Sequence, residues 1–451
     1  MSDSNTQNSV TRRHFLKSQA AIAAIGATPL LGTAAAALGA TTPVTAAMPA
    51  KQSPGLPDYY DKLKVKKIIN AAGVFTIYCA ATMPPEVEHA IEQAAKHPVH
   101  LQELQKNAGE YIAEKLRCEG AVVSCGASSA LTLGTAACIQ AANKCRPTDI
   151  PQEIGGKFPK NEVIVQKAHR YGYDHAMFLC GVKIVEVVTL DDYKRAFTPN
   201  TVMTNFFNAG DFGAGEGAQI GQQDWLDVAH QHDVPCHLDA AADMPPIENL
   251  WKYTGMGWDL VCFSGGKGIR GPQNAGLLLG KKRLTDLAHA NNSPGDGVGR
   301  GMKVAKEQLV GMVAAVDWVL TQTDAGWDKE FTRRANVIGH MMKDIPTVTT
   351  SIETAPIANH VPHLYLHFDP VKLGVTTAEA QARLRSATPA IELHPSTGAR
   401  VGSEGLPSGT NALIVGTWML NPGEELIVGR QIHKVLTDPK SVGEYTPRVR
   451  G

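Results

Sequence analysis

Short apolar runs alternate with segments of helical periodicity through the middle of this chain, and this alternation restricts the folds that it can adopt. The strand-like runs are short and rich in β-branched or aromatic residues, and they occupy 120–124, 162–166, 182–188, 201–207, 234–239 and 259–263. Helical patterns occupy the intervals, as at 130–142, 173–180 and 223–232. The alternation predicts an α/β fold with a mostly parallel sheet that helices flank on both faces.

Helix and strand patterns also flank this central region. Helices are expected at 84–96, at 102–116 and, as one long pattern, at 303–344, and a strand is expected at 68–77. From residue 344 onward, short strand and helix patterns mix, which predicts a smaller C-terminal α/β domain over 344–451. An N-terminal segment and a large domain are expected over 47–343. A chain of 451 residues is long enough for both domains.

The segment 1–46 is expected to be an export signal rather than part of the fold. Arg12 and Arg13 precede an apolar, alanine-rich run over 20–40, which is typical of a twin-arginine signal, and small residues at 44–46 suit cleavage. Stable membrane insertion is not expected, because the run is weakly hydrophobic and broken by Pro29. We therefore expect a periplasmic protein that the twin-arginine export machinery carries in its folded state.

Composition and cysteine spacing argue against a nucleic-acid partner and against a metal site. Basic and acidic residues each number 43, so the formal net charge is zero and no surface for nucleic acid is predicted. The eight cysteines include no C-x-x-C pair and no cysteine–histidine cluster with zinc spacing, so no metal site is expected. Buried free thiols are the favoured interpretation of these cysteines, and one or two disulfides stay open as an alternative.

A single lysine, Lys267, stands between two strand-like runs at 259–263 and 275–279. Glycines flank it on both sides, and glycine lets other groups approach the backbone closely. The ordinary interpretation is a lysine at the rim of a loop that points to water. In a protected cleft, by contrast, the ammonium form would be disfavoured and the amine would become nucleophilic.

Two further features favour the second interpretation. A turn of small residues at 124–129 joins a strand to an apolar helix, and Asp239 ends the run at 234–239. Pyridoxal phosphate chemistry needs backbone donors at a helix N-terminus for the phosphate, a carboxylate for the pyridine nitrogen and an amine for the aldehyde. On the turn alone, two alternatives stay open: a tight turn without a ligand, and a nucleophile at Ser124 or Cys125 that lacks the G-x-S-x-G spacing.

Seven short motifs also carry a family resemblance, and they lie at 69–73, 102–105, 123–127, 237–240, 263–267, 271–273 and 421–425. The most specific is Ser264-Gly-Gly-Lys267 followed by Gly271-Pro-Gln273. Through them the chain resembles the fold-type-I pyridoxal phosphate enzymes, from about residue 66 to the C-terminal helix. Within these it is most similar to the selenocysteine synthase (seryl-tRNA selenium transferase) group and the D-glucosaminate-6-phosphate ammonia lyases.

The resemblance implies roles for particular residues. Lys267 would form the internal aldimine, and Asp239 would pair with the pyridinium nitrogen. The residues implied around the phosphate are Cys125, Gly126, Ala127, Ser128 and Ser264. A ring normally stacks on the cofactor, and the candidates for it are His169, Tyr173 and His175. The resemblance also implies a homodimer or larger homo-oligomer.

A substrate carboxylate or phosphate needs a guanidinium, and the candidates, in order of preference, are Arg300, Arg270 and Arg400. The expected activity is elimination, of the ammonia-lyase type, on a small amino acid or amino sugar acid through a quinonoid carbanion. Lys267 would move the α-proton. The alternatives are an aminotransferase, a racemase, a selenium-transferase-like enzyme, a thiol enzyme that uses Cys125, and a non-catalytic exported binding module. Neutral charge and export both argue against a transfer-RNA substrate.

Overall fold

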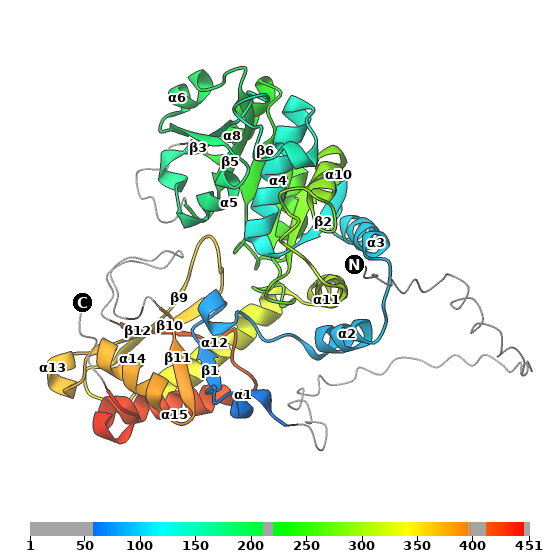
Figure 1. The fold of residues 1–451 in the computed structure, drawn as a ribbon. Coiled ribbons are helices and arrows are strands. Elements are labelled where there is room, and N and C mark those ends of the chain that lie inside the picture. The colour runs from blue at the N-terminus through cyan, green and yellow to red at the C-terminus, as the bar shows by residue number, and fades with distance from the viewer. Residues whose placement is uncertain (1–56, 211–219, 396, 398–411, 446–451) are drawn as a thin grey trace, which may run out of the picture. The chain divides into compact units, whose positions relative to one another are not determined.

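A seven-stranded sheet occupies the middle of the chain in the computed structural model (Figure 1), which describes residues 57–210, 220–395, 397 and 412–445. The strand order is β2-β8-β7-β6-β5-β3-β4. The strands are β2 Gly120–Ser124, β3 Glu162–Gln166, β4 Lys183–Val187, β5 Thr201–Phe207, β6 Cys236–Asp239, β7 Leu260–Ser264 and β8 Gly276–Gly280. β8 is antiparallel to both of its neighbours, and the other neighbouring pairs are parallel. The predicted α/β class with a mostly parallel sheet is confirmed.

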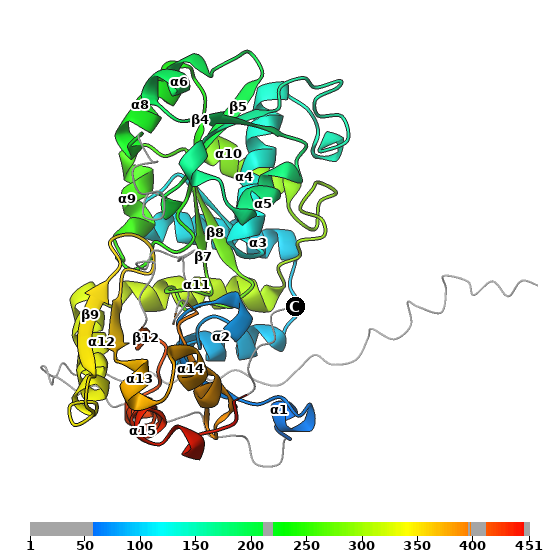
Figure 2. The ribbon, with the colours of Figure 1, turned by 90° about the vertical axis from the view of Figure 1, so that its left-hand side faces the viewer.

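Helices cover both faces of this sheet (Figure 2). One face carries α3 Leu101–Lys115, α8 Gln222–Gln231, α9 Asn249–Met256 and α11 Lys306–Leu320. The other carries α4 Gly126–Asn143, α5 His175–Phe178 and α10 Lys282–Asn291. Successive strand residues alternate between the two cores, so Leu238 and Phe263 pack on the α8 face while Cys262 packs on the α4 face. A short helix, α6 Leu190–Arg195, follows β4.

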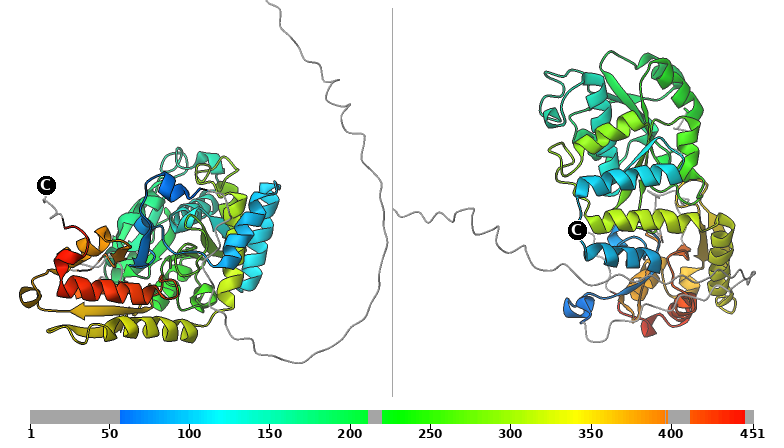
Figure 3. Two further views of the ribbon diagram at one scale, coloured as in Figure 1. Left: turned by 90° about the horizontal axis from the view of Figure 1, so that it is seen from below. Right: turned by 90° about the vertical axis from the view of Figure 1, so that its right-hand side faces the viewer.

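The C-terminal part builds two smaller sheets. An antiparallel sheet has the order β12-β10-β9, with β9 Thr349–Thr354, β10 Pro362–His367 and β12 Ala412–Gly416. The N-terminal strand β1 Ile68–Ala71 pairs in parallel with β11 Ala390–Leu393. The remaining helices are α1 Tyr59–Lys62, α2 Pro85–Ala95, α12 Asp324–His340, α13 Pro370–Leu373, α14 Thr377–Ser386 and α15 Glu424–Thr437. Figure 3 shows α12 beside α15 and α2 beside α11.

The described residues belong to one compact unit, so the domain boundary expected at residue 344 stays a prediction. The export signal expected over 1–46 and the candidate Arg400 lie outside the described residues. Among the helices that are described, none combines the length and the apolar character needed to cross a bilayer.

Three expected elements differ in extent. The strand expected at 68–77 ends at Ala71, because the Asn70 amide donates to the carbonyls of Gly73 and Ala80 and bends the chain back. The pattern at 303–344 is two helices, α11 and α12, since the Thr323 hydroxyl accepts from the Gly326 N–H and starts a new helix. The helix expected from residue 130 begins at Gly126, within the turn of small residues.

Gly276, the first residue of β8, allows the sheet and α4 to meet. A Cβ at this position would lie 2.5 Å from the carbonyl carbon of Gly126 and 2.8 Å from the nitrogen of Ala127. Both atoms belong to the backbone at the start of α4, so neither can move aside as a flexible side chain would. The absence of a side chain at Gly276 is therefore a packing requirement.

A Gly276→Ala variant tests this close approach. We expect urea unfolding to show a loss of about 2–3 kcal/mol, because the added methyl group displaces backbone rather than side chains. The matched control is Gly255→Ala in α9, where a Cβ meets no heavy atom within 4 Å. It should leave stability unchanged or raise it by about 0.5–1 kcal/mol. Equal stabilities of the two variants would contradict the packing requirement.

Candidate active site

Three segments reach the same edge of the central sheet, at the carboxyl ends of its parallel strands. β2 ends at Ser124, β6 at Asp239 and β7 at the half-buried Ser264. Gly276 pairs with Ser124 on one side and with Ser264 on the other, so the turns that follow β2 and β7 are neighbours. Asp239 pairs with Cys262 of β7. The sheet thus brings together the three features that the sequence predicts to form a site.

The turn after β2 leads directly into α4. Cys125 occupies the N-cap position without accepting a hydrogen bond through its side chain, and Gly126 has φ +78° with open space where a Cβ would lie. Ala127 is half-buried and Ser128 is exposed. Ser129 is 4% exposed, and its Oγ has no hydrogen-bond partner within the described ranges. An uncapped helix N-terminus beside an unpartnered buried hydroxyl suits an anion.

Lys267 lies half-buried in the tight turn between β7 and β8. A Cβ on Gly266 would lie 2.5 Å from the Cα of Gln273, and one on Gly268 would lie 2.3 Å from the carbonyl oxygen of Met244. The N-terminal segment also reaches this turn, because the Ala81 N–H donates to the Gly266 carbonyl at 3.2 Å. Backbone from two other segments, at Met244 and Ala81, therefore encloses the lysine turn, which is not a free loop rim.

Asp239 is 3% exposed and held by three groups. Its Oδ1 accepts the Ala241 N–H at 3.0 Å and lies 3.5 Å from the Cys262 sulfur, while its Oδ2 accepts the hydroxyl of Tyr171. Burial, reinforced by the Asp239 carboxylate, raises the pKa of Tyr171 well above its usual value, so the phenol stays a donor. These donors fix the orientation of the carboxylate.

Tyr171 is a residue that the sequence analysis missed, although it lies in the same segment as the three candidate rings. Its ring stacks on Phe207 with centroids 4.0 Å apart and planes 14° apart. Phe207 and Asp239 are register partners in β5 and β6. The position of Tyr171 in the sequence could have identified it, because it follows the strand at 162–166 and side chains there reach the carboxyl edge of the sheet.

The three candidate rings differ in exposure and in the rings that they meet. His169 is fully buried and meets Phe206 edge to face, with centroids 4.3 Å apart. Phe206 packs in the core on the α8 face, whereas Phe207 and Asp239 lie on the other face. His175 is exposed at the first position of α5, and Tyr173 is 59% exposed. Stacking by any of these three rings stays a prediction.

The two described arginine candidates differ sharply in their surroundings. Arg270 follows the lysine turn, and its N–H donates to the Lys267 carbonyl at 2.9 Å. Its guanidinium donates to the Trp418 carbonyl, and burial together with the nearby Arg334 lowers its pKa to about 10. No carboxylate pairs with Arg270 among the described residues. Arg300 is exposed and lies 3.4 Å from the Ser293 hydroxyl.

The cysteines lack the features of a thiol catalyst. All eight are free, so none of the disulfides left open by the sequence is present. Burial raises the pKa of the Cys125 thiol, which is the opposite of what a thiolate nucleophile requires.

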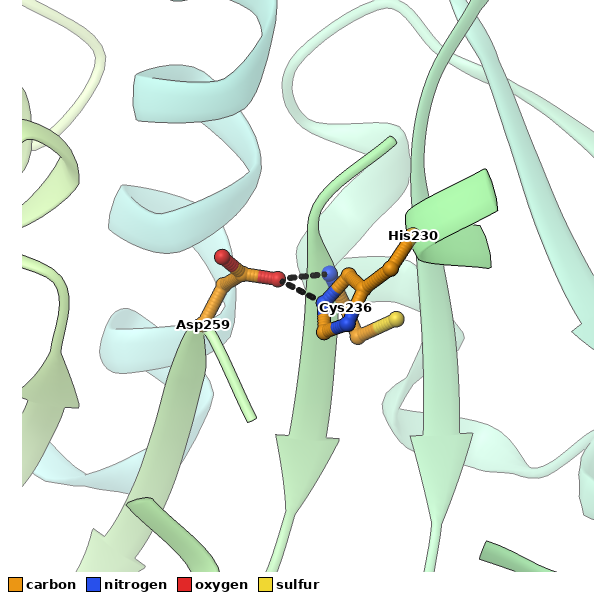
Figure 4. A group of neighbouring side chains, drawn as sticks. All are labelled: His230, Cys236 and Asp259. Carbon is orange, nitrogen blue, oxygen red and sulfur yellow. Dashed lines mark hydrogen bonds and ion pairs between the residues drawn. The ribbon is translucent and has the colours of Figure 1, made fainter. Parts of the chain in front are cut away.

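His230, Cys236 and Asp259 lie close enough together to offer three metal ligands (Figure 4). Their contacts explain them without an ion. Asp259 Oδ2 accepts the Cys236 N–H at 2.9 Å and lies 2.9 Å from the His230 ring, and its Oδ1 lies 3.9 Å from Arg283. Burial raises the pKa of the Cys236 thiol to about 12, and the Thr204 hydroxyl donates to its sulfur. The group joins α8, β6 and β7 structurally.

No family model matches the chain. Two curated enzymes align with most of it. D-glucosaminate-6-phosphate ammonia lyase from Salmonella typhimurium is 25% identical over 344 residues, which cover 74% of this chain and 89% of that protein. A 5'-C-glycyluridine monooxygenase-decarboxylase from a Streptomyces species is 25% identical over 343 residues, covering 74% and 83%. A shorter match is the L-seryl-tRNA(Sec) selenium transferase of Caldanaerobacter subterraneus, 25% identical over 258 residues, covering 51% and 52%.

Solved structures share the fold. The structure of D-glucosaminate-6-phosphate ammonia-lyase superposes with a TM-score of 0.70 at 23% identity, covering 84% of this chain and 98% of that one. A structure of SPT with a PLP internal aldimine superposes with a TM-score of 0.50 at 12% identity, covering 82% and 87%. The expected fold-type-I architecture is confirmed, and so is homology to the ammonia lyase and the selenium transferases.

Proposed function

We propose that this chain is a pyridoxal-phosphate-dependent enzyme, a lyase or transferase, whose active site is the sheet edge at β2, β6 and β7. One observation carries the proposal: the packed turn that holds the half-buried Lys267, a buried carboxylate at Asp239 and the open N-terminus of α4 share this edge. Relatives that align with most of the chain are enzymes, and a protein with the same fold holds the cofactor.

The residues present fit the cofactor. The uncapped N-terminus of α4 and the unpartnered Ser129 hydroxyl would hold the phosphate, with Ser264 beside them. Asp239 would hold the pyridine nitrogen, and Lys267 the aldehyde. When bound, the cofactor supplies an electron-withdrawing ring that stabilises negative charge on the carbon next to the amine.

The chain's own groups then have distinct tasks. The Lys267 amine takes the proton from the α-carbon of the substrate and holds it for return. Tyr171, Cys262 and the Ala241 N–H keep the Asp239 carboxyl group oriented, so that it would face the ring nitrogen in a fixed position. Arg270 carries a positive charge without a carboxylate partner among the described residues, which makes it our candidate for the substrate's acidic group.

We further propose that the reaction is elimination on a small amino acid or amino sugar acid. Loss of the α-proton and of a β-hydroxyl group, followed by hydrolysis, converts such a substrate into one ammonia and one 2-keto acid. The ammonia lyase among the relatives supports this reaction. Transamination and racemisation start from the same proton removal. The zero net charge argues against selenium transfer on a large polyanion.

The first prediction concerns Lys267. The purified chain with added pyridoxal phosphate should gain visible absorbance, and borohydride reduction should fix the cofactor to Lys267, as peptide mass mapping can show. Lys267→Ala should lose both signals. The matched control is Lys281→Ala, which removes an exposed lysine that pairs with Glu119 at 2.8 Å and should retain both. A wild-type chain that stays colourless would refute the proposed cofactor. It would also refute the proposed enzymatic function and favour the alternative of a non-catalytic binding module.

The second prediction concerns the reaction. A screen of β-hydroxy amino acids and amino sugar acids should yield ammonia and 2-keto acid in equal amounts. Arg270→Lys should raise KM by roughly tenfold or more while the cofactor absorbance persists, because a lysine cannot form the bidentate contact. Keto acid formed only in the presence of an amino-group acceptor would show a transaminase, and loss of optical rotation alone a racemase. Release of carbon dioxide would show a decarboxylase.

We also propose export, on the basis of Arg12 and Arg13 ahead of an apolar run. In fractionated bacteria, a double variant with Arg12→Lys and Arg13→Lys should accumulate in the cytoplasm while its cofactor absorbance is unchanged. The control Lys17→Arg, outside the arginine pair, should be exported normally. Periplasmic accumulation of the double variant at the wild-type level would refute the twin-arginine route.

A further inference from the structure

The α1 segment, residues 57–68, leads into β1 and exposes an unusual number of apolar side chains. Sixteen large apolar or aromatic side chains are exposed among the described residues, and five of them lie in these twelve residues. They are 37% to 68% exposed and comprise Tyr59, Tyr60, Leu63, Val65 and Ile68. The helix α1 itself buries no residue. An exposed apolar surface of this kind marks an interaction site.

The backbone of the α1 segment is folded and anchored. The Asp58 carboxylate accepts the Tyr60 N–H at 2.9 Å at the start of α1, and the Val65 N–H donates to the Tyr60 carbonyl at 2.9 Å. A salt bridge between Asp58 and Lys67 joins the two ends of the segment, and β1 then pairs with β11. Figure 2 shows α1 at the outer margin of the C-terminal part. These contacts hold the apolar side chains at the surface.

Lysines alternate with the apolar side chains of the α1 segment. The segment contains four lysines and two aspartates, so its net charge is +2 in a chain whose formal net charge is zero. The Lys62 ammonium lies over the Tyr59 ring, 5.3 Å from the ring centroid. Neither Lys62 nor Lys64 forms a salt bridge with another described residue. The surface thus combines available cations with aromatic and aliphatic groups.

A further exposed ring adjoins the α1 segment. The Lys66 ammonium donates to the Ser386 carbonyl at 2.8 Å, and the Ser386 hydroxyl donates to the Glu444 carbonyl at 2.7 Å. Tyr445 is the next residue and is 37% exposed, and the central carbon of the Arg383 guanidinium lies 5.9 Å from its ring centroid. The cationic and aromatic surface therefore continues from the N-terminal segment onto the C-terminal one.

A phospholipid surface with anionic headgroups fits this combination of groups. Tyrosine rings are favoured at the boundary between headgroups and acyl chains, where one end of the ring is in apolar surroundings and the other is wet. Aliphatic side chains such as Leu63 and Val65 would contact the acyl chains, while the lysine ammonium groups reach the headgroup phosphates. Each lysine near such a surface raises the affinity by a factor of about five.

A second copy of this chain fits the α1 segment less well. A stable protein interface takes roughly 20–30 residues from each partner, whereas the α1 segment has twelve. In a symmetric pair the same surface meets itself, and two segments that each carry a charge of +2 would repel one another. The α1 segment also follows closely on the proposed export signal at 1–46, which would bring it near the membrane during export.

We propose that the α1 segment attaches the folded protein to the surface of a membrane that contains anionic phospholipid. Tyr60, Leu63 and Val65 provide the apolar contact, and Lys62 and Lys64 provide the charge. The attachment is peripheral, and it requires neither the proposed cofactor nor the proposed reaction.

Hydrogen exchange of the full chain, measured by mass spectrometry, tests the proposal at the segment itself. Vesicles of equal parts phosphatidylglycerol and phosphatidylcholine should slow amide exchange in the peptide 57–68, whereas vesicles of phosphatidylcholine alone should not. Sodium chloride at about 1 M should remove the protection, because it shortens the Debye length to about 3 Å. Because the readout is local, contact of the apolar run at 20–40 with the vesicles is not mistaken for it.

Two double variants separate the charge from the apolar contact. Lys62→Gln with Lys64→Gln should raise the vesicle concentration needed for half-protection by roughly tenfold or more, because two cations are lost. Leu63→Ser with Val65→Ser should raise it by roughly the same factor, because the apolar contact is lost. All four side chains are exposed, so the fold should be unchanged in both double variants.

The matched control is Val371→Ser with Lys372→Gln in α13. This helix also has four residues and buries none of them, and Val371 is 89% exposed. In the control variant, the peptide 57–68 should be protected as it is in the wild type.

Four results would overturn the proposal. They are no protection by anionic vesicles, equal protection by neutral vesicles, equal half-protection of the wild type and both double variants, and protection that rises with protein concentration in the absence of lipid. The last result would assign the surface to a second copy of the chain. Absorbance with added pyridoxal phosphate should be the same in all variants, so failure of this surface is distinguishable from failure of the proposed enzyme.

Discussion

The candidate active site depends on backbone atoms that meet with no side chain between them. β8 runs antiparallel between β2 and β7, and α4 begins directly against it because Gly276 has no Cβ. In the same way, Gly268 admits the backbone at Met244 to the lysine turn, and Gly266 lets the turn close on its own residue Gln273. Strand β8 therefore fixes the separation between the open N-terminus of α4 and the turn that carries Lys267. A cofactor that is held by its phosphate at one end and its aldehyde at the other requires such a fixed separation.

Some of the ten described non-glycine residues with positive φ lie near this edge, and the others lie elsewhere. Cys79, Arg270 and Asn359 all have positive φ without being glycine, at 61°, 57° and 45°. The three residues come from segments that are distant in the sequence. Arg270 belongs to the lysine turn, and Cys79 is close in sequence to Ala81, whose N–H donates to the Gly266 carbonyl of that turn. The Asn359 N–H donates to the carbonyl of Ala242, in the segment after β6, at 2.7 Å. Such conformations cost roughly 1–3 kcal/mol each and persist where surrounding contacts impose them. Their gathering here is consistent with a functional edge.

The sequence correctly predicted features that local residue patterns determine, such as the bounds of several strands and the turn that carries Lys267. Gly120–Ser124, Glu162–Gln166 and Thr201–Phe207 are strands with the expected bounds, and glycine spacing identified the lysine turn. It could not predict which face a ring occupies at a strand end, so Tyr171 was not among the three candidate rings, His169, Tyr173 and His175. It also could not show that β1 pairs with β11 more than 300 residues later, because no local pattern encodes a partner.

The two carboxyl groups after β6 show how neighbouring residues acquire different chemistry. Both oxygens of Asp239 accept hydrogen bonds, so its orientation is fixed, as suits a permanent partner for a cation. Asp243 has one oxygen held by the Asn208 amide and one without a donor among the described residues, and burial raises its pKa to about 7, so it can exchange a proton near neutral pH.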